Sequence, residues 1–269
     1  MARTGERDIV VLHITDLHLF GDRDARLFGV ATDRTLAAVL ESAAGRCGRP
    51  DVLIATGDLS QDGAPDSYRR LNTVLERIGV PVLCLPGNHD EPGLMELHLT
   101  GGNVSTRRRL QIGGWQLIQL DSTVAGAVGG HLEPGELAAL ERALRERPDV
   151  YALVCLHHHP VPTGSRWMDG IALDNPEALF RVTEKFPNVR GIIWGHVHQE
   201  FRTRRNGVEL MSTPSTCFQF KPGSPEFSLD DSPPGYRILR LGAEGQLESE
   251  VCRVRGCDSE ADVAATGYS

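Results

Sequence analysis

The sequence has no apolar run long enough to cross a membrane, since a membrane-spanning helix needs about 20 consecutive apolar residues. Near the N-terminus, the apolar run 9–12 is too short and too close to charged residues to form a secretory signal peptide. The six cysteines are scattered, and none forms a pair with the spacing of a zinc or redox motif. These absences predict a cytoplasmic protein with reduced thiols and no membrane partner.

An excess of basic residues is also lacking: Lys and Arg number 28 against 36 Asp and Glu, which gives a formal net charge of −8. A long phosphate backbone requires a basic protein surface, so a nucleic-acid polymer is not the expected ligand. A small anionic substrate is compatible with this charge if the chain holds a local positive centre. The oligomeric state stays open between monomer and homodimer.

No internal repeat and no linker divides the 269 residues, and 40% of them are hydrophobic, which is enough for one buried core. We therefore predict a single domain over residues 1–251. The composition then turns small and polar, which predicts a frayed tail over residues 252–269.

Short apolar runs alternate with segments of helical periodicity along most of the chain. Strands that alternate with helices and then close the chain with further strands predict a layered α/β fold. The predicted strands are residues 8–14, 52–56, 80–85, 115–120, 150–156, 189–194, 208–211 and 236–241. The predicted helices are residues 32–44, 65–78, 134–147 and 175–186.

Polar side chains follow five of these strands, at the point where each strand ends. In open α/β sheets the carboxyl ends of the strands form the crevice where ligands bind, so residues far apart in sequence are predicted to meet there. Alternate residues of an extended segment point to the same side, which predicts that Asp16 pairs with His18 and that His196 pairs with His198. The residues concerned are Asp16, His18, Asp58, Asn88, His89, His157, His196 and His198.

These side chains offer nitrogen and oxygen donors without sulfur, and they are too many for one tetrahedral ion. We therefore predict two divalent or mixed-valence transition-metal ions, and imidazole donors favour iron, manganese, zinc or cobalt over calcium and magnesium. Asp16, Asp58 and one hydroxide would carry three negative charges against four or five positive charges on the ions. A net positive centre inside an acidic chain would attract a phosphodiester.

The blocks D-x-H, G-D-x-x-x-D, G-N-H-D, H-x-x-P and G-H-x-H occur in the order typical of calcineurin-like metallophosphoesterases, which the chain resembles through about residue 250. The resemblance implies a four-layer α/β/β/α sandwich with a dinuclear centre, for which iron and manganese are favoured. It implies that one ion is held by Asp16, His18 and His198. It implies that the other ion is held by Asn88, His157 and His196, with Asp58 bridging both.

The resemblance also implies a catalytic role for His89, which would contact the phosphate and protonate the leaving oxygen. The residues expected to contact the substrate are His18, Asn88, His89 and His198. Within the triplet 157–159, the first histidine emerges directly from the strand and is the predicted ligand, with His158 and His159 as alternatives.

Residues 212–222 closely resemble a segment of bacterial class III 3′,5′-cyclic-AMP phosphodiesterases. This likeness implies hydrolysis of cyclic AMP to 5′-AMP by a metal-bridging hydroxide, with a cyclic nucleotide as the small-molecule partner. The alternatives are a broader phosphodiesterase for glycerophosphodiesters or aryl esters, and an inactive scaffold on the same fold. Relatives have a histidine where Gly129 stands here, so His131 is left open as its replacement.

Other polar residues near these blocks have two interpretations each. His13 lies inside a strand and is interpreted as a satisfied core histidine. Asp62 and Asp90 fit equally well a role in orienting ligands or a role in turns and caps. The run 107–109 of three arginines is interpreted as a solvated edge. Trp167 fits either stacking on a bound base or anchoring of its own loop.

Overall fold

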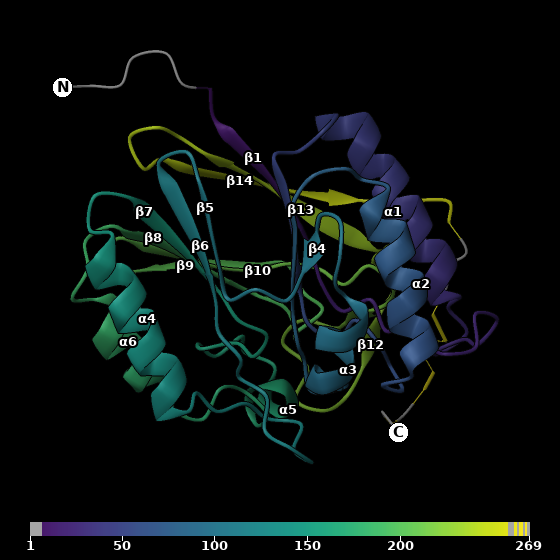
Figure 1. Cartoon of the computed structure of the whole chain (residues 1–269). Coiled ribbons are helices and arrows are strands. Elements are labelled where there is room, and N and C mark those ends of the chain that lie inside the picture. The colour runs from purple at the N-terminus through teal and green to yellow at the C-terminus, as the bar shows by residue number, and fades with distance from the viewer. Residues whose placement is uncertain (1–6, 258–260, 263, 266, 268–269) are drawn as a thin grey trace.

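The computed structural model describes residues 7–257, 261–262, 264–265 and 267, which form two six-stranded sheets and six helices (Figure 1). The first sheet contains β1 (Ile9–Ile14), β2 (Val52–Thr56), β3 (Val82–Leu85), β4 (Val104–Ser105), β13 (Gly235–Leu241) and β14 (Leu247–Arg253). The second contains β5 (Arg109–Ile112), β6 (Trp115–Gln119), β7 (Tyr151–Cys155), β8 (Val189–Trp194), β9 (Phe201–Arg205) and β10 (Val208–Ser212). The helices are α1 (Thr32–Cys47), α2 (Pro65–Glu76), α3 (Pro92–His98), α4 (Pro134–Glu146), α5 (Arg166–Asp169) and α6 (Pro176–Thr183).

The sheets pack face to face, with α1 and α2 on the outer face of the first and α4 and α6 on the outer face of the second (Figure 1). The strand order is β14-β13-β1-β2-β3-β4 in the first sheet and β5-β6-β7-β8-β10-β9 in the second. A short ribbon, β11 (Gln219–Phe220) with β12 (Leu229–Asp230), lies outside both sheets. The predicted four-layer α/β/β/α sandwich is therefore confirmed.

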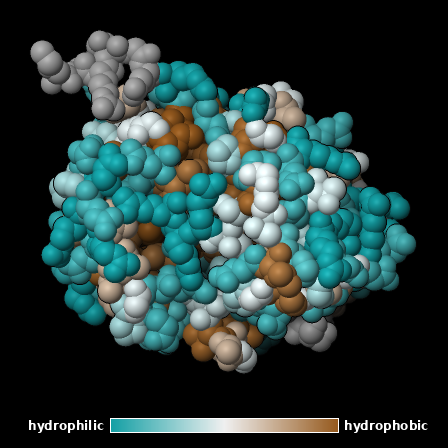
Figure 2. All heavy atoms as spheres, viewed as in Figure 1, coloured by the Kyte–Doolittle hydropathy of each residue, from teal (hydrophilic) through white to brown (hydrophobic). Residues whose placement is uncertain are grey.

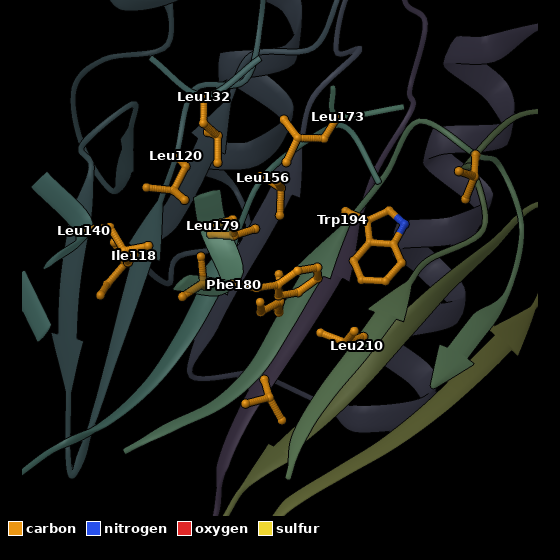
Figure 3. Packing of buried hydrophobic residues seen from close by; sticks show 14 of the residues in the cluster. Ile118, Leu120, Leu132, Leu140, Leu156, Leu173, Leu179, Phe180, Trp194 and Leu210 are labelled. Carbon is orange, nitrogen blue, oxygen red and sulfur yellow. The ribbon is translucent and has the colours of Figure 1, made fainter. Parts of the chain in front are cut away.

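Both faces of each sheet contribute to buried cores, because successive side chains of a strand point to opposite faces. Val11 packs between the two sheets, whereas its neighbour Leu12 packs in the core beneath α1 and α2. On the outer face of the second sheet, Ile118 and Trp194 pack with Phe180 of α6 (Figure 3). Because both faces are apolar, polar side chains have room mainly at the strand ends.

The strand directions bring those ends together. Strands β1, β2 and β3 are parallel, and so are β6, β7 and β8. Their carboxyl ends lie along one edge of the sandwich, where Figure 1 shows α3 and α5. The residues that follow these strands therefore meet at a single edge.

The predicted elements are present with ends shifted by a few residues. The edge strands β4, β5, β9 and β14, the ribbon β11–β12 and the helices α3 and α5 were not predicted. The predicted tail begins too early, because Cys252 and Arg253 still belong to β14 and pair with Tyr236 and Gly235 of β13. Residues 258–260, 263, 266, 268 and 269 of that predicted tail lie outside the described residues.

Among the described helices, none has both the length and the hydropathy needed to cross a membrane. All six cysteines lie within the described residues, and none is paired with another in a disulfide there.

Candidate metal centre

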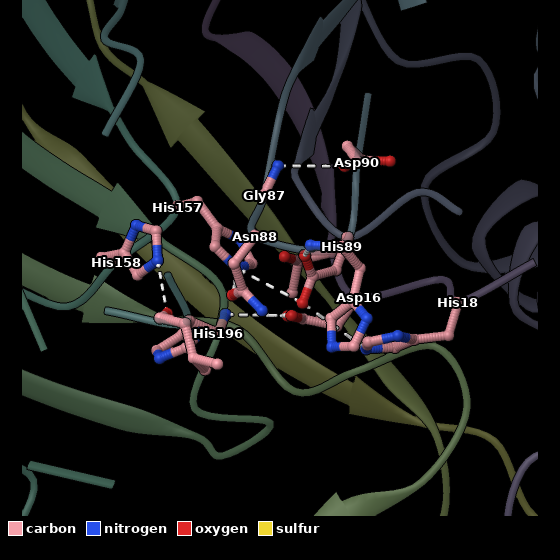
Figure 4. Close-up of polar contacts among 12 residues, drawn as sticks. Asp16, His18, Gly87, Asn88, His89, Asp90, His157, His158 and His196 are labelled. Carbon is pink, nitrogen blue, oxygen red and sulfur yellow. Dashed lines mark hydrogen bonds and ion pairs between the residues drawn. The ribbon is translucent and has the colours of Figure 1, made fainter. Parts of the chain in front are cut away.

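The strand ends bring the predicted donor side chains to one place (Figure 4). On one side, the Nε2 atoms of His18 and His198 lie 3.1 Å apart. His198 Nε2 lies 3.4 Å from Asp16 Oδ1, and His18 Nε2 lies 3.8 Å from Asp58 Oδ2. These side chains follow β1, β2 and β8, so three strands contribute to the first group.

A second group of donors lies on the other side of Asp58. His157 Nε2 is 3.4 Å from Asp58 Oδ2 and 3.2 Å from Asn88 Oδ1. A ring nitrogen of His196 lies within 4.8 Å of one of His157. Asp58 thus stands between the two groups and is close to both. We use the name donor cluster for Asp16, His18, Asp58, Asn88, His157, His196 and His198.

The backbone at the donor cluster is unusual. The φ angle is positive at five of its residues, with values of 52° at Asp16, 48° at His18, 50° at Asp58, 67° at His196 and 47° at His198. Each such residue costs about 1–3 kcal/mol, so the surrounding structure must hold these turns in place. The predicted reason for both pairings, Asp16 with His18 and His196 with His198, was an extended backbone. This reason is wrong, because β1 ends at Ile14, β8 ends at Trp194, and all four residues have positive φ angles.

Two glycines make room for these turns. Gly57 has φ of 90°, and a Cβ atom there would lie 2.5 Å from His157 Nδ1. At Gly87 the limit is space alone, since a Cβ atom would lie 2.2 Å from Asp58 Oδ1. The strand ends can approach each other this closely only because both positions lack a side chain.

Hydrogen bonds fix the orientation of the histidine rings. The Nδ1–H group of His18 donates to Gln61 Oε1 at 2.7 Å, and that of His198 donates to the carbonyl of Phe218 at 2.9 Å. The Nδ1–H group of His157 donates to the carbonyl of Thr56 at 2.8 Å. In these tautomers, inferred from the acceptors, each Nε2 atom directs a lone pair into the donor cluster.

His196 has the opposite orientation, because its Nε2–H group donates to the carbonyl of Ile171 at 3.1 Å and leaves Nδ1 as the electron-pair donor. Lone pairs and carboxylates converging on the same points repel one another unless cations lie between them. The chemistry of the donors, two carboxylates, one amide and four imidazoles, therefore fits transition-metal ions.

The electrostatics of these buried groups lead to the same conclusion. Burial lowers the pKa of His18 to about 3, so its imidazole is neutral and able to bind a metal. Burial opposes ionisation of Asp58, yet the adjacent His157 and His89 hold the pKa of Asp58 well below its usual value. Burial would also lower the pKa of His157, but the Asp58 carboxylate raises it to about 9, so without a metal ion His157 holds a proton that a metal ion would displace. Asp58 is thus held as an anion between the two groups.

His89 lies beside the donor cluster and differs from its members. Its ring centroid is 5.1 Å from that of His18, in an edge-to-face arrangement. Its backbone N–H donates to Asp58 Oδ1 at 3.0 Å, and its side chain is half-buried and lines the adjoining cavity. It can therefore meet a substrate that enters from solvent.

The other two histidines of the triplet face different partners. His158 lies near His196, but its Nδ1 accepts from Ser122 Oγ at 2.8 Å and its Nε2–H donates to the carbonyl of Val128 at 3.0 Å. His159 stacks on His196 with ring centroids 5.6 Å apart, and its Nε2 lies 3.5 Å from Asp169 Oδ1. The nitrogens of His158 bond to Ser122 and Val128, whereas His157 Nε2 lies against Asp58 and Asn88 of the donor cluster, which favours His157 as the donor.

The remaining candidates lie outside the donor cluster. His13 is fully buried and bonds to the hydroxyl groups of Thr56 and Thr213, as expected for a core histidine. His131 Nδ1 lies 2.6 Å from Asp174 Oδ1, and His131 is not among the residues that line the cavity. The three arginines of the run 107–109 bond to Ser105, Glu136 and Glu146 at a partly exposed edge.

Asp90 joins the loops that carry Asp58 and Asn88. Its carboxylate accepts hydrogen bonds from the backbone N–H groups of Leu59, Ser60 and Gly87 at 2.9–3.0 Å and from the Tyr68 hydroxyl at 3.0 Å (Figure 4). Asp90 therefore positions these loops. Asp62, by contrast, accepts from the backbone N–H groups of Gly21 and Ala64 and stabilises a turn.

Sequence reasoning did not identify Gln61 or the backbone carbonyls that orient the rings. Gln61 stands within the G-D-x-x-x-D block, so its place three residues after Asp58 was an available signal. The carbonyls of Thr56, Ile171 and Phe218 have no signal in the sequence, because every residue has one.

Comparison with known proteins identifies the class. Residues 9–200 match the family described as calcineurin-like phosphoesterase. The chain belongs to this family, whose members are hydrolases that use a dinuclear metal site.

Several relatives are similar over almost the whole chain. The chain is 42% identical over 263 residues to the 3′,5′-cyclic adenosine monophosphate phosphodiesterase CpdA of Pseudomonas aeruginosa, covering 98% of this chain and 96% of that protein. It is 40% identical over 265 residues to the protein of the same name from Escherichia coli (strain K12), with the same coverage of 98% and 96%. A 3′,5′-cyclic-nucleotide phosphodiesterase of Nostoc sp. is 38% identical, covering 91% of this chain and 92% of that protein.

Solved structures share the fold at low sequence identity. A purple acid phosphatase from yellow lupin (Lupinus luteus) has a TM-score of 0.65 and 16% identity, covering 96% of this chain and 53% of that one. A dimetal phosphatase from Danio rerio has a TM-score of 0.59 and 18% identity, covering 93% and 100%. These likenesses show the fold alone.

We predict that Asp90→Asn weakens metal binding more than Tyr68→Phe does. The amide group of Asn would face one or more of three backbone N–H donors, and each unsatisfied buried donor costs about 1–3 kcal/mol. Tyr68→Phe removes two hydrogen bonds, one to Asp90 and one from the Glu91 N–H group, but leaves the three backbone N–H bonds to Asp90 in place. Calorimetric titration with Mn²⁺ measures the affinity, and denaturant unfolding measures stability separately. Activity of Asp90→Asn should recover in part at raised metal concentration. Wild-type metal affinity in folded Asp90→Asn would exclude the positioning role.

Proposed function

We propose that this chain hydrolyses 3′,5′-cyclic AMP to 5′-AMP at a dinuclear metal centre. The observation that carries the proposal is the extent of the similarity to relatives named cyclic-AMP phosphodiesterases, which reaches 98% of this chain. The family match ends at residue 200. The similarity to these relatives extends further along the chain, through β13 and β14. It therefore includes the segment 212–222, whose likeness to cyclic-AMP phosphodiesterases is apparent from sequence.

Each of the two donor groups would hold one ion. We assign Asp16, His18 and His198 to the first ion and Asn88, His157 and His196 to the second. Asp58 would bridge them, because its Oδ2 lies 3.8 Å from His18 Nε2 on one side and 3.4 Å from His157 Nε2 on the other. Iron and manganese are the proposed metals, with zinc and cobalt as alternatives.

Two bound ions would supply a hydroxide nucleophile at neutral pH and would offset the negative charge of the phosphate. His89 would hydrogen bond to the phosphate and donate a proton to the 3′ oxygen as the P–O3′ bond breaks. Its half-buried position at the cavity fits this role. We propose that His18, Asn88 and His198 contact the same phosphate from the other side.

The charge of the substrate should also select among phosphates. A cyclic diester carries one negative charge, whereas a monoester such as 5′-AMP carries more and would be held by the ions as an inhibitor. We therefore expect diesters to be the substrates and the monoester product to be a competitive inhibitor.

We predict that Asp58→Ala lowers turnover by several orders of magnitude and removes metal from both positions, because a bridging carboxylate serves both ions. Metal content per chain and initial rates are measured on the same samples. The matched control is Asp62→Asn, which alters a carboxylate of the same loop outside the donor cluster and should keep wild-type metal content. Near-normal turnover and metal content in Asp58→Ala would contradict the bridging assignment.

We predict that His89→Ala keeps its metal but lowers kcat for cyclic AMP by about 10²–10⁴-fold, the range of a general acid or a transition-state contact. An aryl diester has a good leaving group that needs little protonation, so its kcat should fall less. Equal losses for both substrates would leave His89 a role in phosphate binding only.

We predict that chromatography of a cyclic-AMP reaction shows 5′-AMP as the product and that a chelator abolishes its formation. Release of 3′-AMP would contradict the proposed orientation. Turnover of glycerophosphodiesters without turnover of cyclic AMP would favour the broader phosphodiesterase, and no metal-dependent turnover of any diester would favour the scaffold.

A further inference from the structure

The cavity beside the donor cluster has two chemically different sides. Its volume is about 150 Å³. One side consists of His89 and members of the donor cluster. The opposite side, which we call the apolar wall, consists of Val128, Trp167, Met168, Ile171 and Phe220. A phosphate would contact only the polar side of the cavity. The apolar wall therefore fits an apolar part of the ligand.

The apolar wall is packed firmly against the donor cluster. The Phe220 ring lies 4.4 Å from the His198 ring, centroid to centroid, and Trp167 packs edge-on against Phe220 at 4.9 Å. The carbonyl of Ile171 accepts the hydrogen bond from His196 Nε2. Met168 is buried in the core of the outer layer. The wall therefore stands at a fixed distance from the phosphate-binding side.

Of the two roles predicted for Trp167, the structure shows the anchoring of its own segment. Its ring contacts with Phe220 at 4.9 Å and Phe227 at 5.4 Å anchor α5. It also lines the cavity, so anchoring does not remove it from the reach of a ligand.

Val128 is an apolar side chain that is largely exposed to solvent. Its exposed fraction is 51%, although it lies at the cavity and its carbonyl is tied to His158. In the same loop, Val124 is 39% exposed but does not line the cavity. The visible face of the molecule is mainly hydrophilic, with separate small hydrophobic areas, one of them at the lower edge (Figure 2). A ligand resting on Val128 would remove apolar surface from water.

We infer that the apolar wall receives the nucleobase of the substrate and selects for its flat apolar surface rather than for its identity. This inference rests on the proposed function and names the specificity of the same site. The wall residues carry no charged side chain, and the buried indole Nε1 of Trp167 is their only side-chain hydrogen-bonding group, so the base edge is not read by polar side chains. Stacking and apolar contact tolerate any base, so cyclic GMP should react as well as cyclic AMP to within several-fold.

The test compares two ligands that share a phosphate and differ in the base. Calorimetry of the Mn²⁺-loaded protein gives Kd for 5′-AMP and for ribose 5-phosphate. We expect 5′-AMP to bind about 10-fold more tightly, as one base contact contributes in other proteins. Because this is a binding measurement, it stands apart from whether cyclic AMP is turned over. Failure of cyclic-AMP turnover would overturn the proposed function, whereas equal Kd values would overturn the inference.

Variants locate the effect on the wall. Val128→Ala, at an exposed position that leaves the fold intact, should reduce the preference for 5′-AMP about 3-fold through lost apolar contact. Trp167→Ala should nearly abolish the preference, while Val124→Ala, the matched control, should leave it unchanged. Ribose 5-phosphate should bind all variants alike. If Val128→Ala leaves the preference intact, or weakens both ligands equally, the wall does not hold the base.

Discussion

The structure depends on placing the seven side chains of the donor cluster, two of them carboxylates, at one edge of the sandwich, where six of the seven are buried. Asp16, His18 and His198 are almost fully buried, as are Asp58 and His157. Desolvation of such groups is costly unless they are compensated, and the tautomers direct their lone pairs at common points. The arrangement is stable as a set only with cations among the donors.

Residues outside the donor cluster hold its side chains in position. Asp90 ties the loop of Asp58 to the loop of Asn88 through three backbone N–H groups. Backbone carbonyls and Gln61 fix the ring orientations, and left-handed turns aim the side chains at the centre. Strained backbone and buried charge are typical of functional sites, where they persist because the surrounding packing over-determines them. The same packing carries the apolar wall, so the chemistry and the selectivity of the site share one scaffold.

Much of this could be predicted from sequence, and the failures have physical reasons. Apolar runs ending in Asp58 or His157 located the strand ends, because buried strands are long apolar runs and catalytic side chains follow them. The edge strand β9 was missed because three of its five residues are arginines, which give no apolar run. The alternation of side chains along a strand does not explain why Asp16 and His18 lie close together. Both residues have left-handed backbone conformations, and their N–H groups donate to the backbone carbonyls of Gly57 and Asp58. The position of His131 depended on Asp174, which lies 43 residues away.

The central claim is that two ions share one carboxylate at this edge of the sandwich. Anomalous-difference crystallography of crystals grown without chelator, at the absorption edges of iron and manganese, tests it most directly. The account predicts two peaks per chain, one in contact with Asp16, His18 and His198 and the other with Asn88, His157 and His196, with Asp58 touching both. A single peak in fully active protein, or a peak held by His158 or His159 in place of His157, would contradict it.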